Sequence, residues 1–324
     1  MSHNEKQSLL NAVHLIGVPS DSGAGRLGAS MGPDALRVAG LQPALQSMGL
    51  QVSDSGNLAG PPNLRTERDP AHAGLRNFDT NLLWNQRVHD AVFHSLDAGQ
   101  LPIMMGGDHA FALGSISAVA RHCRQAGKTL RVLWLDAHAD CNTPESSPSG
   151  NVHGIPVASL CGLGPEAFTS LGGHTPAVQP NELCLIGLRS VDDQEKRILD
   201  SLQIEAYDMR AIDELGMREV MQRALRGLDG PDAETIHLHV SFDVDFLDPS
   251  IAPGTGTTVR GGPDYREAQL CMEMIADTGL LSSLDVVELN PALDSHNQTA
   301  ELVVDLLQSL FGKSTLLRHR AKPL

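Results

Sequence analysis

Short apolar segments alternate with amphipathic segments along almost the whole chain of 324 residues. The apolar segments are rich in Leu, Ile and Val and have the length of buried strands. We predict strands at VHLIGV near Val13 and at residues 101–105, 130–135, 183–188, 236–242 and 283–289. Strands that alternate with helices are typical of a parallel sheet with helices on both faces. The pattern therefore predicts an α/β fold.

The intervals between these strands carry helical periodicity. The first predicted helix begins after Gly32 and Pro33, because proline is favoured in the first turn of a helix. The others cover about residues 80–98, 110–126, 193–203, 216–227, 264–278 and 297–311. Two long connections, 54–79 and 141–180, are rich in Pro, Gly and Ser, and loops of that length are often functional. The motifs described below come from both halves of the chain, so we expect residues 1–324 to form a single domain.

Composition narrows the class of protein. Hydrophobic residues make up 41% of the chain, enough for a substantial core, and the formal net charge of −15 argues against a nucleic-acid-binding surface. The five cysteines are scattered and form no CxxC pair, which favours reduced thiols. The N-terminal MSHNEKQSLL lacks the features of a signal peptide, and no segment approaches the roughly 20 apolar residues of a membrane span. We expect a cytoplasmic protein without a nucleic-acid or membrane partner.

Ionisable side chains follow the predicted strand LRVLWL in the sequence DAHAD. If DAHAD continues that strand, Asp136, His138 and Asp140 point to the same face. Open α/β sheets place their ligand sites at the carboxyl ends of strands, which is where this segment lies. A solvated strand end is the ordinary alternative for one Asp and one His. Three ionisable groups directly after a buried strand favour a ligand-binding site, because unpaired charges there would cost free energy.

Two further strands are followed by groups of the same kind. Asp243 and Asp245 end the apolar segment IHLHVSF, whereas Asp248 stands beside a proline and is assigned to the next turn. His109 follows LPIMM in the sequence GGDHA. Each has an ordinary alternative when taken alone, since Asp108 could cap a helix and His109 could be a core histidine. Together, three strand ends supply four carboxylates and two imidazoles.

This set of side chains suits two divalent metal ions. Carboxylates with a few imidazoles favour Mn²⁺, Mg²⁺ or Fe over Zn²⁺ bound by thiolates. Two metals about 3.5–4 Å apart can lower the pKa of a shared water molecule and orient it. The excess of negative charge favours a cationic substrate. The residues therefore predict metal-assisted hydrolysis.

Six motifs in order carry a resemblance to a known family: GAGRLGASMGPDALR, GGDHAFALGSIS, DAHADCNTPESSPSGNVHG, IGLRSVDDQE, SFDVDFLDPSIAPGTGT and DVVELNP. The chain resembles the ureohydrolases, which include arginases and agmatinases, and it is more similar to the arginase group. The resemblance implies a three-layer α/β/α fold with a mostly parallel sheet. It also implies two Mn²⁺ ions per subunit and a homo-trimer or homo-hexamer.

The resemblance also implies a role for each site residue. One Mn²⁺ would take His109, Asp136, Asp140 and Asp243, and the other Asp136, His138, Asp243 and Asp245. A bridging hydroxide would attack the guanidinium carbon, and Asp140 would hold the proton of that hydroxide. Glu288 would pair with the guanidinium. His153 would act as acid–base or proton shuttle; without the surrounding motif, a loop histidine bonded to backbone is the ordinary alternative.

For the substrate, the resemblance implies L-arginine, cleaved to L-ornithine and urea. Asn142 and Ser149 would bind the α-carboxylate directly, and Asn151 through water. Asp192 and Glu195 would face the α-ammonium group, although an Asp cap with a Glu in the first turn of a helix has the same spacing. Thr257 is a further expected site residue. Alternatives are an agmatinase, another guanidino or formimino hydrolase of the family, and a non-catalytic regulatory protein of the same fold.

Overall fold

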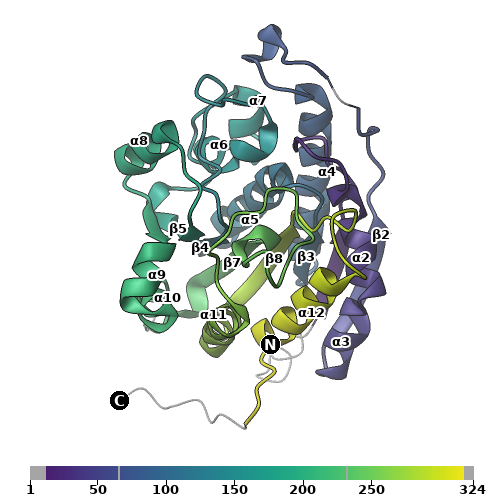
Figure 1. The fold of residues 1–324 in the computed structure, drawn as a ribbon, viewed down its shortest axis with the longest axis vertical. Helices are drawn as coiled ribbons and strands as arrows, with labels where there is room; N and C mark the ends of the chain where they lie inside the picture. Colours follow the sequence, from purple (N-terminus) through teal and green to yellow (C-terminus); the bar gives the residue numbers. More distant parts are fainter. Residues whose placement is uncertain (1–11, 65, 231–232, 317–324) are drawn as a thin grey trace.

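The computed structural model describes residues 12–64, 66–230 and 233–316, which form a sheet of eight parallel strands covered by helices (Figure 1). The strands are β1 (Ala12–Gly17), β2 (Gln51–Asn57), β3 (Leu101–Met105), β4 (Thr129–Leu135), β5 (Leu183–Leu188), β6 (Glu205–Asp208), β7 (Ile236–Asp243) and β8 (Leu281–Val287). Their order across the sheet is β2-β1-β3-β8-β7-β4-β5-β6.

Helices cover both faces of the sheet, as the sequence predicts. They are α2 (Gly32–Val38), α3 (Leu41–Ser47), α4 (Phe78–Asp97), α5 (Ala112–Ala126), α6 (Pro156–Leu160), α7 (Glu166–Thr169), α8 (Asp193–Leu202), α9 (Met209–Leu215), α10 (Met217–Ala224), α11 (Tyr265–Thr278) and α12 (Gln298–Leu310). In Figure 1, α11 and α12 lie in front of the sheet, and α4 and α5 lie behind it. The result is a three-layer α/β/α arrangement.

Two hydrophobic clusters fill the spaces between the sheet and its helix layers. Alternation along β3 shows how the strand serves both clusters: Ile103 and Met105 pack on the side of α2, α3, α11 and α12, and Met104 packs on the side of α4 and α5. All three side chains are fully buried. A central parallel strand is buried on both faces, so it reads as a continuous apolar segment.

The six predicted strands are all present, with ends within two residues of the expected positions. The sequence did not predict β2 and β6, which are the two edge strands of the sheet. Their sequences are QVSDSGN and EAYD, and their side chains alternate between exposed and half-buried positions. An edge strand needs no continuous apolar segment, and for that reason the pattern used to predict the central strands does not detect it.

The carboxyl ends of β3, β4, β5, β7 and β8 lie at one edge of the sheet, because all the strands are parallel. The chain segments that leave these ends carry the motifs singled out in the sequence. The long connection after β4 contains the short helices α6 and α7. The other long connection runs from the end of β2 to α4, and its described residues contain the 3-10 turn Pro70–His72.

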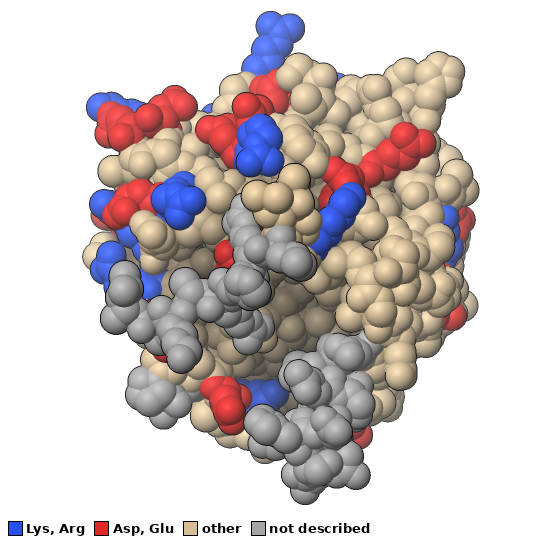
Figure 2. Space-filling view, turned by 90° about the horizontal axis from the view of Figure 1, so that it is seen from below, with Lys and Arg blue, Asp and Glu red and all other residues tan. Residues whose placement is uncertain are grey.

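Charged side chains of both signs are interspersed on the face shown in Figure 2, around a hollow whose visible surface is largely uncharged. Among the described residues, no helix has both the length and the apolar character needed to cross a membrane. The N-terminal sequence MSHNEKQSLL, on which the prediction about a signal peptide rests, lies outside the described residues.

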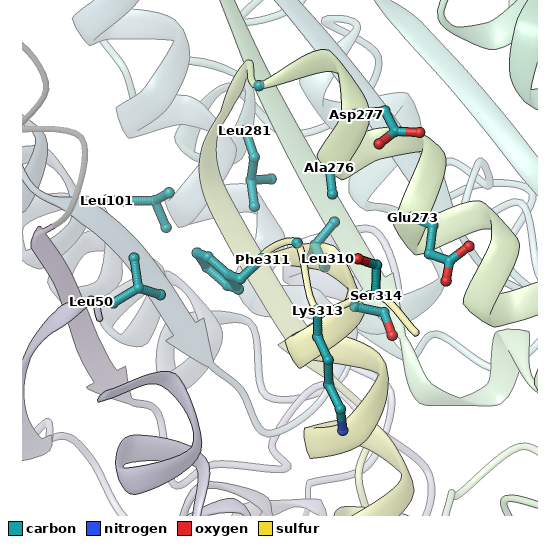
Figure 3. A pocket seen from close by; sticks show the side chains of 13 residues that line it. Leu50, Leu101, Glu273, Ala276, Asp277, Leu281, Leu310, Phe311, Lys313 and Ser314 are labelled. Atoms are coloured by element: carbon teal, nitrogen blue, oxygen red, sulfur yellow. The ribbon is translucent and has the colours of Figure 1, made fainter. Parts of the chain in front are cut away.

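A cavity of about 420 Å³ lies at the edge where β3 and β8 begin (Figure 3). Its apolar lining includes Leu101, Leu281 and Phe311. The Lys313 side chain extends away from these apolar groups, and the cavity holds no cluster of the ionisable motifs. The ionisable motifs lie at the opposite edge of the sheet, where the strands end.

The packing of α4 against α5 gives a test of the fold. A Cβ atom at Gly114 would stand 2.3 Å from the backbone carbonyl oxygen of Asn85. Alanine is the better helix former by about 1 kcal/mol, but overpacking against backbone costs about 1–3 kcal/mol. We expect Gly114→Ala to lower the free energy of unfolding, measured by denaturant titration.

The matched control is Gly230→Ala, where the nearest atom to the new Cβ lies at 3.7 Å. This variant should stay within about 0.5 kcal/mol of the parent protein. A Gly114→Ala protein that is as stable as the parent, or more stable, would contradict the close approach of α4 to α5.

Candidate metal centre

The segment DAHAD leaves the sheet instead of continuing it. β4 ends at Leu135, and beyond it His138 makes only an isolated parallel bridge with Ser190. Asp140 has a φ of +48°, a left-handed conformation that is strained for a residue with a Cβ. The assumption that these side chains alternate along a strand is therefore wrong. A turning backbone brings them together instead.

His109 lies at the centre of the first group of ligands. It sits in the 3-10 turn that follows β3, and its side chain is 1% exposed. The Nδ1 atom of His109 lies 3.0 Å from Asp136 Oδ2, 3.2 Å from Asp140 Oδ2 and 3.1 Å from Asp243 Oδ2. These four side chains are the set that the resemblance gave to one metal.

His138 lies at the centre of the second group. Its Nδ1 atom is 3.0 Å from Asp245 Oδ2 and 3.4 Å from Asp136 Oδ1. The two oxygens of Asp136 thus face different histidines, Oδ2 toward His109 and Oδ1 toward His138. A carboxylate placed in this way can contact two metal ions at once, as the resemblance implied for Asp136. The resemblance gave Asp243 the same bridging role, but Asp243 falls only in the compact group around His109.

The donor set fits divalent cations. The ligand atoms fall into two groups, His109–Asp136–Asp243 and Asp136–His138–Asp245, each compact enough to hold an ion. The buried Nδ1 atom of His109 has no hydrogen-bond partner of acceptable geometry among the described residues, although three carboxylate oxygens surround it. An imidazole nitrogen that faces carboxylate oxygens without a hydrogen bond suits metal ligation, because both groups are ligands of divalent cations.

Two side chains that the sequence did not single out orient these ligands. Ser241 Oγ lies 2.9 Å from His109 Nε2, on the ring edge away from the aspartates. The indole Nε1 of Trp134 donates to Asp136 Oδ2 at 2.9 Å, and its ring stacks on that of His109. Such partners fix the orientation of a ligand. Each stands two residues before a candidate ligand, and strand alternation could have found them.

Burial and the neighbouring charges shift the pKa values of the side chains in this cluster. Burial alone would lower the pKa of His109, but the surrounding aspartates raise it well above its ordinary value. Burial likewise opposes the charged form of His138, yet Asp245 and Asp136 raise its pKa to about 12. Burial and the carboxylates of Asp245 and Asp136 raise the pKa of Asp243. The buried carboxylates are stable in their charged form only with compensating positive charge, which protons or metal cations can supply.

Glu288 and His153 form a pair beside the cluster. His153 Nδ1 lies 3.0 Å from Glu288 Oε1, and the same oxygen accepts the backbone N–H of His109 at 3.0 Å. Burial would lower the pKa of His153, but Glu288 and Asp140 raise it to about 9. Glu288 follows β8 with a φ of +62°. Both Asp140 and Glu288 thus hold strained backbone conformations, which are common at functional sites.

A cavity of about 220 Å³ opens over the cluster. It is lined by His138, Asp140, Asn142, Ser147, Pro148, Ser149, His153, Gly154, Ser190, Asp192, Glu195, Asp243, Thr257 and Glu288. The structure therefore brings the candidate substrate contacts together with one exception, Asn151, which lines the neighbouring hollow on the outer side of Ser149. Ser147 and Ser190 are lining residues that the sequence analysis missed.

The acidic pair at the start of α8 serves the helix as well as the cavity. Asp192 Oδ1 accepts the backbone N–H groups of Gln194 and Glu195, and Glu195 Oε2 accepts that of Asp192. This is the capping box that the spacing offered as the ordinary alternative. The second oxygen of Asp192 accepts from Asn142 Nδ2 at 2.8 Å. One cap thus links α8 to the loop after β4.

Arg189 holds the loop that carries Asp245. Its guanidinium donates to the carbonyl oxygens of Asp245, Phe246, Leu247 and Val259. From that loop, Thr257 Oγ1 donates to Asp245 Oδ2 at 2.8 Å. The sequence indicated Thr257 only by resemblance and gave no signal for Arg189, whose contacts are all with backbone. In the structure, Thr257 contacts a candidate metal ligand.

Three comparisons place this chain among known proteins. Residues 11–312 match the model of the Arginase family. The arginase of Brucella melitensis is 42% identical over 308 residues, which cover 94% of this chain and 97% of the relative. The arginase of Staphylococcus aureus (strain COL) is 39% identical over 305 residues, covering 94% and 98% respectively. The crystal structure of Bacillus caldovelox arginase is 40% identical, covers 94% of this chain and all of its own, and superposes with a TM-score of 0.88. Because its sequence and fold match those of arginases over nearly their whole length, the chain belongs to the Arginase family and is a ureohydrolase of the arginase type.

Proposed function

We propose that this protein is a binuclear manganese hydrolase that converts L-arginine to L-ornithine and urea. The carrying observation is the pair of ligand groups that share Asp136 at the base of a cavity with a polar, partly acidic lining. The candidate metal ligands at the base of this cavity suit hydrolysis. Its polar and acidic lining suits the charged head group of an amino acid. The relatives at about 40% identity are named arginases, which supports arginine as the substrate.

Six side chains would hold the metal pair: His109, Asp136, Asp140, Asp243, His138 and Asp245. When bound, two Mn²⁺ ions would lower the pKa of water and so supply a nucleophile at neutral pH. The protein fixes the ligands on stable supports. Ser241 and Trp134 orient His109 and Asp136 from the ends of central strands. Arg189 fixes the loop that carries Asp245.

The guanidinium of the substrate would lie between Glu288 and the base of the cavity. A carboxylate is the natural partner of a guanidinium, because it can accept two parallel N–H bonds. In the structure Glu288 Oε1 contacts His153, so substrate binding would place the guanidinium beside that histidine. His153 is then within reach to donate a proton to the departing amine. Asp140, which also lines the cavity, would hold the proton of the attacking hydroxide.

The head group of the substrate would lie at the end of the cavity formed by two loops. Asn142 and Ser149 offer an amide and a hydroxyl for the α-carboxylate. Asp192 and Glu195 offer carboxylates for the α-ammonium group from the start of α8. We place Asn151 at a water-mediated position, since it lies outside this cavity. An agmatinase would not depend on these contacts, because agmatine lacks the α-carboxylate.

We also propose that the chain works as one domain and assembles into a homo-trimer or homo-hexamer in the cytoplasm. The single domain is supported by the site itself, whose residues come from the ends of five strands of one sheet. The assembly is inferred from the family resemblance. Light scattering on the purified protein gives the number of subunits directly, and a monomer at working concentration would refute this assembly.

The proposed reaction is tested by measuring urea and ornithine from the purified protein. We expect equal amounts of both products from L-arginine and far less urea from agmatine or guanidinobutyrate at the same concentration. Chelator treatment should abolish the reaction, and added Mn²⁺ should restore it. Faster urea release from agmatine would make this protein an agmatinase. No urea from any guanidine, with Mn²⁺ present, would favour a regulatory protein.

His153 gives a test of proton transfer. We expect His153→Ala to lower kcat by about 10²–10⁴-fold, the usual contribution of a general acid or base. Its manganese content should match the parent, because His153 is in neither ligand group. The control is His174→Ala, an exposed loop histidine whose ring bonds to the carbonyl oxygen of Pro176. An unchanged kcat in the His153 variant would refute the assignment.

Asn142 gives a test of head-group recognition. We expect Asn142→Ala to lower kcat/KM for arginine by about 10- to 150-fold, because a hydrogen bond to a charged group contributes about 1.5–3 kcal/mol. Agmatine lacks the carboxylate, so its kcat/KM should fall much less. An equal loss for both substrates would mean that Asn142 supports the site through its contact with Asp192 and does not read the carboxylate.

A further inference from the structure

The connection between β2 and α4 packs against the loop that forms the outer wall of the cavity. Arg68 belongs to this connection and is exposed. Its guanidinium nevertheless makes three hydrogen bonds to backbone: Nε donates to the carbonyl oxygen of Gly74 at 3.1 Å, Nη1 to that of Pro148 at 3.2 Å and Nη2 to that of Ser147 at 3.2 Å. All three guanidinium nitrogens of this exposed arginine thus donate to carbonyl oxygens, and the side chain is fixed in place.

Arg76 continues this contact along the same loop. Its Nε donates to the carbonyl oxygen of Ser149 at 3.1 Å, and its backbone N–H donates to that of Gly150 at 2.8 Å. Nη1 donates to the carbonyl oxygen of Thr66 and so ties the arginine to its own segment. The carbonyl oxygens of four consecutive residues, 147–150, therefore all accept hydrogen bonds from Arg68 and Arg76.

The two segments also approach too closely for side chains at the point of contact. A Cβ atom at Gly150 would stand 2.4 Å from the carbonyl oxygen of Gly74 and 3.1 Å from Nε of Arg68. Gly150 has a φ of +72° and Gly74 a φ of +81°, conformations that favour glycine. We call the contact of Arg68 and Arg76 with residues 147–150 the arginine clasp.

The segment that bears the clasp is itself anchored to the body of the protein. Leu75, between Gly74 and Arg76, is fully buried. Asn77 Nδ2 donates to the carbonyl oxygen of Ser22 at 2.8 Å. The ring of His72 stacks on Phe78, which packs in turn on the buried Phe168. The clasp therefore joins the outer loop to a segment that is anchored to the body of the protein.

The clasp acts on the wall of the cavity that is proposed to read the α-carboxylate. Ser147, Pro148 and Ser149 line that cavity, while Pro148 and Ser149 also line the hollow that Arg68 and Arg76 form on the other side. With the carbonyl oxygens of the loop bonded to the clasp, fewer acceptors are left to repel a carboxylate. The two guanidinium charges add a positive potential at the same wall.

We propose that Arg68 and Arg76 are positioning residues that determine specificity for substrates with an α-carboxylate. They act through the 147–150 backbone and touch no reacting atom. The inference rests on the proposed hydrolysis of arginine and deepens it, because it assigns part of the selection between arginine and agmatine to a segment distant in sequence from the catalytic motifs.

The test uses the full-length manganese enzyme with Arg68→Gln, Arg76→Gln and the double variant. We expect the KM for arginine to rise by about tenfold or more in the double variant, with kcat within about threefold of the parent. The ratio of kcat/KM for arginine to that for agmatine should fall. Amide hydrogen exchange of Ser147, Ser149, Gly150 and Asn151 should speed up in the metal-free protein as well, since it reports the loop and not the reaction.

Two controls separate the clasp from other effects. Arg87→Gln removes an exposed arginine of α4 that donates to the carbonyl oxygen of Ala59, away from the cavity, and it should behave like the parent. Arg68→Lys keeps the charge but cannot donate to the same three carbonyl oxygens, so it should lose specificity as Arg68→Gln does. If the double variant does not fold, the two single glutamine variants and Arg68→Lys decide the question by the same readouts.

The proposal is overturned if folded variants keep the parent KM for arginine and the parent exchange rates, or if arginine and agmatine lose kcat/KM equally. Failure of the proposed function looks different. In that case the parent protein itself releases no urea from arginine, whereas failure of the clasp leaves the parent active and makes its variants indistinguishable from Arg87→Gln.

Discussion

The mutual repulsion of four buried aspartates is the constraint on which this structure depends. Asp136, Asp140, Asp243 and Asp245 are each less than 10% exposed, and they share one small region at the edge of the sheet. Buried like charges this close are unfavourable by several kcal/mol unless cations compensate them. Histidines alone compensate only when they carry protons. The fold thus provides a site whose charged form bound metal cations would stabilise.

Parallel topology makes this concentration of charge possible. Strands that run in one direction bring their carboxyl ends to one edge, where turns after β3, β4 and β7 meet without crossing the core. The apolar strands behind them exclude water and strengthen each electrostatic contact. Side chains that would take no direct part in the reaction then serve to position those that would. Trp134 and Ser241 orient ligands, and Arg189 fixes backbone, each from within this frame.

The sequence predicted what depends on burial and on side-chain identity. Central strands were predictable because burial on both faces requires continuous apolar segments. The clustering of the candidate ligands was predictable because acids and histidines are conspicuous after such segments. The turn at Asp140 was not predictable, since a left-handed Asp has no sequence signal of its own. Arg68 was not predictable either, because its partners are backbone carbonyl oxygens, which every residue has. The edge strands were not predicted for a similar reason, because the pairing of β2 relies on backbone hydrogen bonds and not on apolar side chains.

The central claim is that the shared carboxylate of Asp136 joins two metal sites. Crystals grown with Mn²⁺ and measured at its absorption edge test this claim without reference to activity. The account predicts two anomalous peaks per chain, one beside His109 Nδ1 and one beside His138 Nδ1, both in contact with Asp136. A single peak, or none at this edge of the sheet, would contradict it.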